Sequence, residues 1–92
     1  MIQRYILTID VGTSSTKTAV WNDAGKQLAE AAQPYALHRP EPIWAEIDGR
    51  VWWEAVCATV RQVVAKSNID PQHVAGIGVD GEVELTEAVH DL

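Results

Sequence analysis

Cysteine and basic residues are scarce in this sequence of 92 residues, and each shortage restricts its class. The single cysteine, Cys57, excludes an internal disulfide framework and fits a reducing compartment such as the cytosol. Only 7 lysines and arginines stand against 13 aspartates and glutamates, which gives a formal net charge of -6. A chain this acidic lacks the basic surface that binds nucleic acids or anionic membranes. We therefore expect a cytoplasmic protein that binds neither.

Long apolar runs are absent as well. No stretch approaches the roughly 20 apolar residues that a membrane-spanning helix needs. The first residues lead into a mixed segment that contains the polar Thr8 and Asp10, which is not typical of a secretory signal peptide. With 47% hydrophobic and 22% charged residues, the composition is typical of one small globular domain.

Three strand patterns fill the first third of the chain. Residues 5–11 alternate apolar and mixed positions, so Asp10 is expected at the polar carboxyl end of one face. Residues 16–22 and 26–33 predict two further strands. The loop between these two ends at Gly25, which suits a left-handed backbone. The pattern therefore predicts a three-stranded antiparallel meander.

A proline-rich loop and a helix are expected next. Residues 34–47 hold three of the four prolines and predict an extended loop of a length that is often functional. Asp48 fits the N-cap of a helix, and Asn68 is a plausible stop. The expected apolar stripe of this helix consists of Trp53, Val56, Val60, Val63 and Val64, with Trp52 beside them. Core packing is therefore predicted for Trp53.

After a turn at Asp70–Pro71, a buried fourth strand is predicted over residues 74–79, ending at Asp80 and Gly81. The helix crosses over before this strand, and right-handed crossovers favour a fourth strand parallel to the first. The predicted fold class is therefore α/β with a mixed sheet. Residues 82–92 form an acidic tail for which a helix, a strand and a frayed end all remain open.

The turn after the first strand contains residues that suit phosphate binding. A carboxylate at Asp10 can hold magnesium, usually through water molecules. Gly12 permits a sharp turn, and the amides of residues 12–15 could converge on phosphate oxygens. Lys17 adds a charge for a phosphoryl group. Hydroxyl donors come from Thr13, Ser14 and Ser15. An ordinary hairpin explains the same composition, because glycine, serine and threonine favour turns for local reasons.

Four segments together point to one family. Residues 9–17 (Ile-Asp-Val-Gly-Thr-Ser-Ser-Thr-Lys) resemble the first phosphate motif of the superfamily of actin, heat-shock chaperones and sugar kinases. Residues 34–48 are similar to the proline-rich loop and the Trp-x-Glu-x-Asp pattern of FGGY carbohydrate kinases. Residues 52–56 resemble the doubled tryptophan that opens the first helix of that family. Residues 77–81 resemble its next strand, which ends near the sugar site.

The resemblance covers residues 5–81 and implies a partial ribonuclease H-like domain. It implies a parent enzyme that transfers the terminal phosphoryl group of ATP, with magnesium, to a hydroxyl of a sugar or polyol. The implied cofactor-binding residues are Asp10, Gly12, Thr13, Ser14, Ser15 and Lys17, with Asp10 also the implied metal ligand. Asp80 and Gly81 are implied near the substrate. We divide the chain into a partial amino-terminal domain, residues 1–81, and a tail, residues 82–92, that does not resemble the family.

The catalytic base, the second phosphate loop and the adenosine region of the family lie downstream of the present sequence. We therefore expect no turnover from this chain alone and assign it no catalytic residue, since phosphoryl transfer depends on several elements at once. Two alternatives remain. One is a non-catalytic module that self-associates, as a homo-oligomer, through an exposed sheet edge. The other is a fragment of a related superfamily ATPase, such as the activators of dehydratases.

Overall fold

The computed structural model describes residues 3–35 and 49–81. The predicted N-cap at Asp48, the proline-rich loop beyond Tyr35 and the tail 82–92 lie outside these residues. The elements in chain order are β1 (Tyr5–Val11), β2 (Ser15–Asn22), β3 (Gln27–Pro34), α1 (Gly49–Ser67), the 3-10 turn η2 (Pro71–His73) and β4 (Val74–Gly81).

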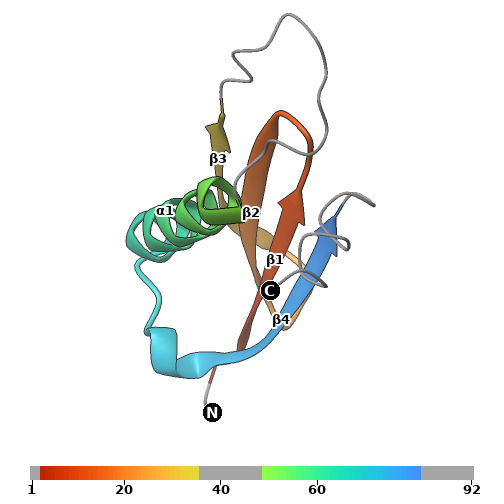
Figure 1. Ribbon diagram of the computed structural model, residues 1–92. Coiled ribbons are helices and arrows are strands. Elements are labelled where there is room, and N and C mark those ends of the chain that lie inside the picture. The colour runs from red at the N-terminus through yellow and green to blue at the C-terminus, as the bar shows by residue number, and fades with distance from the viewer. Residues whose placement is uncertain (1–2, 36–48, 82–92) are drawn as a thin grey trace, which may run out of the picture.

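The strands form one sheet in the order β3-β2-β1-β4 (Figure 1). β2 runs antiparallel to both β1 and β3, whereas β4 runs parallel to β1. The predicted α/β fold, with an antiparallel meander, a crossover helix and a parallel fourth strand, is confirmed. No helix within the described ranges has the length and apolar character that a membrane crossing requires.

β1 alternates between a buried and an exposed face along its whole length, as the pattern predicts. The second hairpin also forms as expected, with Gly25 at φ 81°. The side-chain oxygen of Asn22 stabilises this turn because it accepts hydrogen bonds from the amides of Ala24 and Lys26 at 3.0 and 2.9 Å. Local turn chemistry therefore sets the pairing of β2 with β3.

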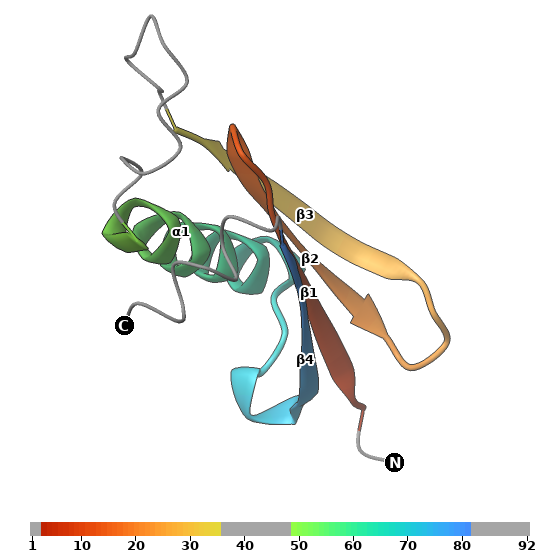
Figure 2. The same ribbon diagram turned by 45° about the vertical axis from the view of Figure 1, so that its right-hand side comes forward.

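Helix α1 covers one face of the sheet and leaves the other face open (Figure 2). It packs mainly against β2 and β3. Two apolar clusters fill this layer. One contains Tyr5, Leu7, Val20, Ala31, Val63 and Ile69, and the other contains Ile9, Val11 and Trp52. The second cluster lies under the turn between β1 and β2, so it supports the segment that carries the phosphate-binding candidates.

A buried pair of threonines joins the helix to the sheet. Thr18 and Thr59 are both fully buried, and their hydroxyl oxygens lie 2.7 Å apart. Thr59 donates its hydroxyl hydrogen to the carbonyl oxygen of Ala55 at 2.8 Å, so Thr18 donates to Thr59. The Thr18 hydroxyl thus depends on Thr59 for its hydrogen-bond partner, because both groups are buried.

The apolar stripe of α1 is centred one residue away from its predicted position. Trp52 is only 6% exposed, whereas Trp53 is 66% exposed, so core packing of Trp53 was a wrong prediction. The buried residues of the helix are Trp52, Ala55, Thr59 and Val63, whose spacing of three and four places them on one side. Adjacent tryptophans both fit the periodicity, and only the contact with the sheet selects between them.

β4 is exposed over most of its length, so the prediction of a buried strand was also wrong. Ile77 and Val79 lie beside Leu7 and Ile9, yet they are 60% and 64% exposed. The physical reason is the position of α1, which lies over β2 and β3 rather than over the β4 side of the sheet. The sheet therefore has an apolar edge on this side.

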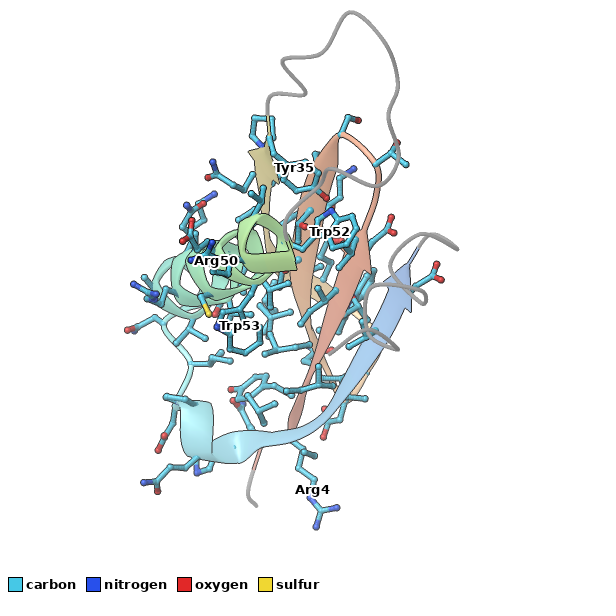
Figure 3. All side chains as sticks on the ribbon, in the orientation of Figure 1. Arg4, Tyr35, Arg50, Trp52 and Trp53 are labelled. Atoms are coloured by element: carbon cyan, nitrogen blue, oxygen red, sulfur yellow. The ribbon has the colours of Figure 1, made fainter. Side chains whose placement is uncertain are left out.

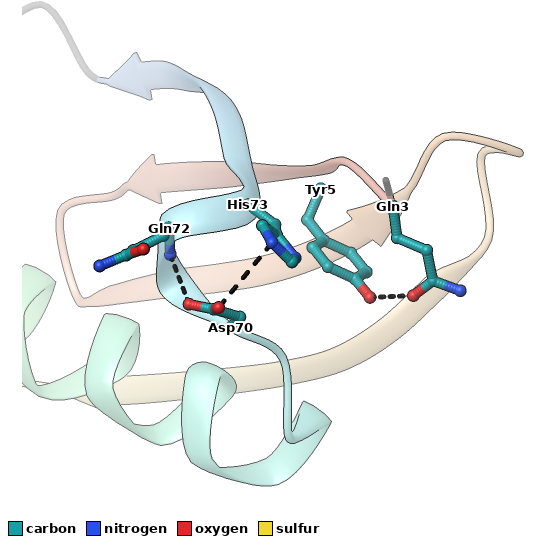
Figure 4. Close-up of polar contacts among 5 residues, drawn as sticks. All are labelled: Gln3, Tyr5, Asp70, Gln72 and His73. Carbon is teal, nitrogen blue, oxygen red and sulfur yellow. Dashed lines mark hydrogen bonds and ion pairs between the residues drawn. The ribbon is translucent and has the colours of Figure 1, made fainter. Parts of the chain in front are cut away.

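The helix ends and the chain returns through a short capped turn. Asn68 takes φ 57°, which stops α1 where the sequence predicts. The Asp70 carboxylate then accepts a hydrogen bond from the amide of Gln72 at 2.9 Å and lies 3.8 Å from His73 (Figure 4). The predicted turn at residues 70–71 is confirmed, and it delivers the chain into β4 alongside β1.

The buried threonine pair gives a testable prediction for stability. We expect Thr59→Val to lower the free energy of unfolding by ~1–3 kcal/mol, because the Thr18 hydroxyl loses its buried partner. The double variant Thr18→Val with Thr59→Val should lie within about 1 kcal/mol of the wild type, since both polar groups are removed together. Urea denaturation followed by circular dichroism measures both, with Thr13→Val at an exposed position as the control. Additive losses in the double variant would contradict this account.

Candidate functional site

The turn between β1 and β2 is tight, and it leaves little room for a side chain at residue 12. The Gly12 amide donates to the carbonyl oxygen of Ser15 at 2.9 Å. A Cβ atom at Gly12 would lie 3.2 Å from that same oxygen, closer than side chains normally come. The Gly12 amide is therefore occupied within the turn and does not face outward. This corrects the expectation that all the amides of residues 12–15 are available to a ligand.

The tip of the turn is open. Thr13 and Ser14 are exposed, and Ser15 is half-buried. Within the described residues, the amides of Thr13 and Ser14 donate to no other backbone group. Their hydroxyls likewise extend from an exposed position. The tip thus presents N–H and O–H donors in a short span, an arrangement suited to anion oxygens.

Tyr35 braces this turn from the end of β3. Its amide donates to the carbonyl oxygen of Ser14 at 3.0 Å, and its phenol donates to the carbonyl oxygen of Gly12. The Thr16 hydroxyl lies 3.3 Å from the phenol oxygen. Because the phenol has a single hydrogen, which it gives to Gly12, the Thr16 hydroxyl donates to Tyr35. One aromatic residue therefore holds two carbonyls of the turn.

Burial of the ring raises the pKa of the Tyr35 phenol above its ordinary value. The hydrogen bond from Thr16 and the nearby N–H of Trp52 act in the opposite direction, while the negative charge of Asp10 again raises the pKa. The Trp52 N–H influences the phenol although, among the described residues, no atom accepts it at hydrogen-bond geometry. Burial dominates, so the phenol remains a protonated donor at neutral pH.

Figure 3 shows Tyr35 and Trp52 together at the end of the sheet where β1 passes into β2. Trp52 comes from the first turn of α1 and packs with Ile9 and Val11. Tyr35 packs against the same cluster from the side of β3. The turn is therefore supported from three elements, which restricts the positions that its backbone can adopt.

Three charged residues form a row across the open face at the same end of the sheet. Asp10 of β1 pairs directly with Lys17 of β2 on one side and with Asp80 of β4 on the other. Residues paired in this way share a face and lie within reach of one another. All three are exposed. In the part of the chain that the structure describes, no ion pair joins Lys17 to a carboxylate.

The sheet register thus brings together two groups of residues that are far apart in the sequence. The residues expected on the phosphate side, from Asp10 to Lys17, lie beside Asp80 and Gly81, which are expected on the substrate side. Gly81 pairs with Val11, directly before the turn. The carboxyl ends of β1 and β4 meet at one edge, where ligands commonly bind in open α/β sheets.

Asp10 and Asp80 fit a magnesium ion better than a transition metal. Among the described residues there is no cluster of three or more histidine, cysteine, aspartate or glutamate side chains. Magnesium needs less, because it retains several waters and is typically held by one or two carboxylates together with ligand phosphates. Two neighbouring carboxylates meet this requirement, with Asp10 next to the phosphate-binding turn.

Three residues that support the turn were not predicted from the sequence in this role: Tyr35, Thr16 and Trp52. Tyr35 stands at the start of the proline-rich segment, and its sequence position gives no indication of contact with residues 12–14. Thr16 is a polar residue on the buried face of β2, fully inaccessible to solvent. The alternation of faces along β2 could have indicated a structural role for Thr16, because a buried hydroxyl needs a hydrogen-bond partner.

Comparisons with known proteins give a consistent family. The sequence pattern of "FGGY family of carbohydrate kinases, N-terminal domain" matches residues 5–90 and so includes most of the segment 82–92. A glycerol kinase of Citrifermentans bemidjiense is 39% identical over 82 residues, which cover 89% of this chain and 17% of that protein. A glycerol kinase of Pediococcus pentosaceus is 36% identical over 86 residues, which cover 94% of this chain and 17% of the relative.

Solved structures of sugar kinases share the fold. Gluconate kinase from Lactobacillus acidophilus superimposes with a TM-score of 0.74 at 28% identity, covering 87% of this chain and 16% of that structure. Xylulose kinase from Rhodospirillum rubrum gives 0.72 at 28% identity, with 87% and 16% covered. The chain thus spans about a sixth of the length of these proteins. It belongs to the FGGY family of carbohydrate kinases and carries part of the N-terminal domain of that family.

Proposed function

We propose that this chain supplies the phosphate side of an ATP-dependent carbohydrate kinase site. The exposed tip at Thr13 and Ser14 receives the terminal phosphates of ATP, and Lys17 contacts the phosphoryl group that is transferred. Asp10 holds the accompanying magnesium ion. The observation that carries this proposal is the row of Lys17, Asp10 and Asp80 beside the turn, set by the sheet register.

The electrostatics of the row support a cation and a phosphate together. Asp10 and Asp80 are paired like charges, which repel one another unless a cation lies near both. A magnesium ion would reduce this repulsion, and the bound phosphate would then face Lys17. The overall charge of -6 disfavours an anion, so the local donors must provide the attraction.

The acceptor is proposed to be a sugar or polyol that binds on the side of Asp80 and Gly81. The relatives and structural neighbours include glycerol, gluconate and xylulose kinases, whose substrates are all small polyhydroxylated molecules. A carboxylate such as Asp80 can accept hydrogen bonds from such hydroxyls. Because Asp80 pairs with Asp10, a sugar or polyol bound at Asp80 would have a hydroxyl close to the proposed phosphate site.

The first test is binding of magnesium-ATP to the 92-residue chain, measured by calorimetry or by amide NMR resonances. We expect saturable binding that requires magnesium, and we expect Lys17→Ala to weaken it about tenfold, because a charged contact to phosphate is lost. Lys26→Ala, in the exposed hairpin at the far end of β2, is the matched control and should leave the affinity unchanged.

The same preparation should not phosphorylate glycerol, gluconate or xylulose above a protein-free control, because phosphoryl transfer needs elements beyond one loop. Absence of any magnesium-dependent binding, or equal losses in Lys17→Ala and Lys26→Ala, would overturn the proposal. Phosphorylation above that control would show that the chain is catalytically active, and the proposal that it only binds magnesium-ATP would be wrong.

A second candidate function is self-association through the β4 edge. Ile77 and Val79 are 60% and 64% exposed on an edge strand whose single charge is Asp80. Edge strands normally carry charges or prolines that prevent pairing with another chain, and β4 has few such features. Antiparallel pairing of two β4 strands would extend the sheet and bring the apolar side chains of the two strands into cross-strand contact.

Light scattering at increasing protein concentration tests this second function. We expect the wild type to form dimers or larger species, and Ile77→Lys to reduce association because it places a charge in the edge. Ile6→Lys changes an exposed residue of the same type on β1, the strand next to the edge, and on the opposite face of the sheet, so it should not reduce association. A wild type that stays monomeric at high concentration would exclude self-association.

A further inference from the structure

We propose that Tyr35 is the positioning residue for the amides of Thr13 and Ser15, holding each of them toward the proposed phosphate site. The inference rests on the phosphate-binding function proposed above and deepens it. Tyr35 itself contacts no ligand. It acts on the turn through two carbonyl groups, and the turn presents the donors.

The geometry of the peptide bond carries the argument. In a trans peptide unit, the C=O and N–H groups point in opposite directions within one plane. The described residues contain no cis peptide bond. The carbonyl of Gly12 and the amide of Thr13 belong to one such unit. Because the Tyr35 phenol holds that carbonyl, the Thr13 amide must point away from Tyr35.

The peptide unit between Ser14 and Ser15 is held in a similar way. The carbonyl of Ser14 and the amide of Ser15 share a peptide plane, and the amide of Tyr35 holds that carbonyl at 3.0 Å. The Ser15 amide therefore also points away from Tyr35. Two alternate peptide units are thus oriented by one residue: the Thr13 N–H points away from the phenol of Tyr35, and the Ser15 N–H points away from its backbone amide.

Tyr35 is itself held firmly enough to do this. Pro34 pairs with Ser15 at the end of the β2–β3 ladder, which places the Tyr35 amide next to the turn. The Thr16 hydroxyl donates to the phenol oxygen from a fully buried position. The ring packs against the cluster that contains Trp52, so its inner side is shielded from water. Shielding strengthens the bond to Gly12, since little water competes for the carbonyl.

The two bonds of Tyr35 differ in how they can be tested. The amide bond to Ser14 survives any side-chain substitution, whereas the phenol bond to Gly12 is removed by Tyr35→Phe. This substitution keeps the ring and its packing. The matched control is Tyr5→Phe, which makes the identical change at a buried tyrosine whose phenol donates to Gln3 at the other end of β1 (Figure 4).

The orientation of the amides is read directly from residual dipolar couplings of the N–H bonds in the 92-residue chain. In Tyr35→Phe, we expect the coupling of Thr13 to shrink through averaging, because its peptide plane is no longer held. The couplings of residues within β1 and β2 should stay unchanged. Tyr5→Phe should leave the Thr13 coupling at its wild-type value. An unchanged Thr13 coupling in Tyr35→Phe would overturn the inference.

Binding gives the functional readout. With magnesium-ATP as the probe, we expect Tyr35→Phe to weaken the affinity about fivefold to tenfold, since one oriented donor is lost. Tyr5→Phe should bind as the wild type does, even if both variants lose similar stability. A similar loss of affinity in both variants would show that Tyr35 acts only through stability and would overturn the positioning role.

Thr16→Val provides a second variant if Tyr35→Phe fails to fold. It removes the hydroxyl that donates to the phenol while keeping the side-chain shape, and a smaller reduction of the Thr13 coupling is expected. The experiments can contradict either proposal without contradicting the other. If the wild type binds no magnesium-ATP, the proposed function is wrong, and the dipolar couplings alone decide whether Tyr35 orients the turn.

Discussion

The register of β1 between its two neighbours decides which of its residues face the core and which face the open side of the sheet. Side chains alternate along a strand, so a shift of one residue would exchange the buried and open faces. The buried face of β1 holds its apolar residues against α1, and this burial selects one register. Asp10 is then forced onto the open face beside Lys17 and Asp80. The charged row is thus a consequence of packing on the opposite side of the sheet.

The turn after β1 shows how a short polar segment acquires a defined shape. Its composition permits many turns, and its tip is exposed. A single conformation is selected because its carbonyls are held from outside, by a tyrosine that enters from β3 and rests on a tryptophan of α1. Partly buried polar contacts of this kind are stronger than exposed ones because less water competes for them, and removing one partner leaves the other unsatisfied. The donors at the tip are therefore ordered by residues that are distant in sequence.

The sheet is asymmetric in its coverage, and this explains both wrong predictions about burial. α1 lies over β2 and β3, so the apolar face of β4 stays exposed although its sequence is typical of a buried strand. The same placement turns Trp52 inward and leaves Trp53 in solvent. Periodicity gives the spacing of an apolar stripe, but its exact centre depends on where the helix meets the sheet. Neither property can be read from local sequence.

Local sequence is enough to predict the order and type of the elements, the hairpin at Gly25, the stop at Asn68 and the family resemblance of the turn after β1. These features depend on local backbone preferences and on alternation, which act over a few residues. Contacts between residues that are distant in the sequence, in contrast, arise from the fold. Asp10 and Asp80 are 70 positions apart, and they become neighbours because β4 returns parallel to β1 after the crossover helix. Tyr35 reaches Gly12 for the same kind of reason, since strand pairing rather than sequence proximity sets that contact.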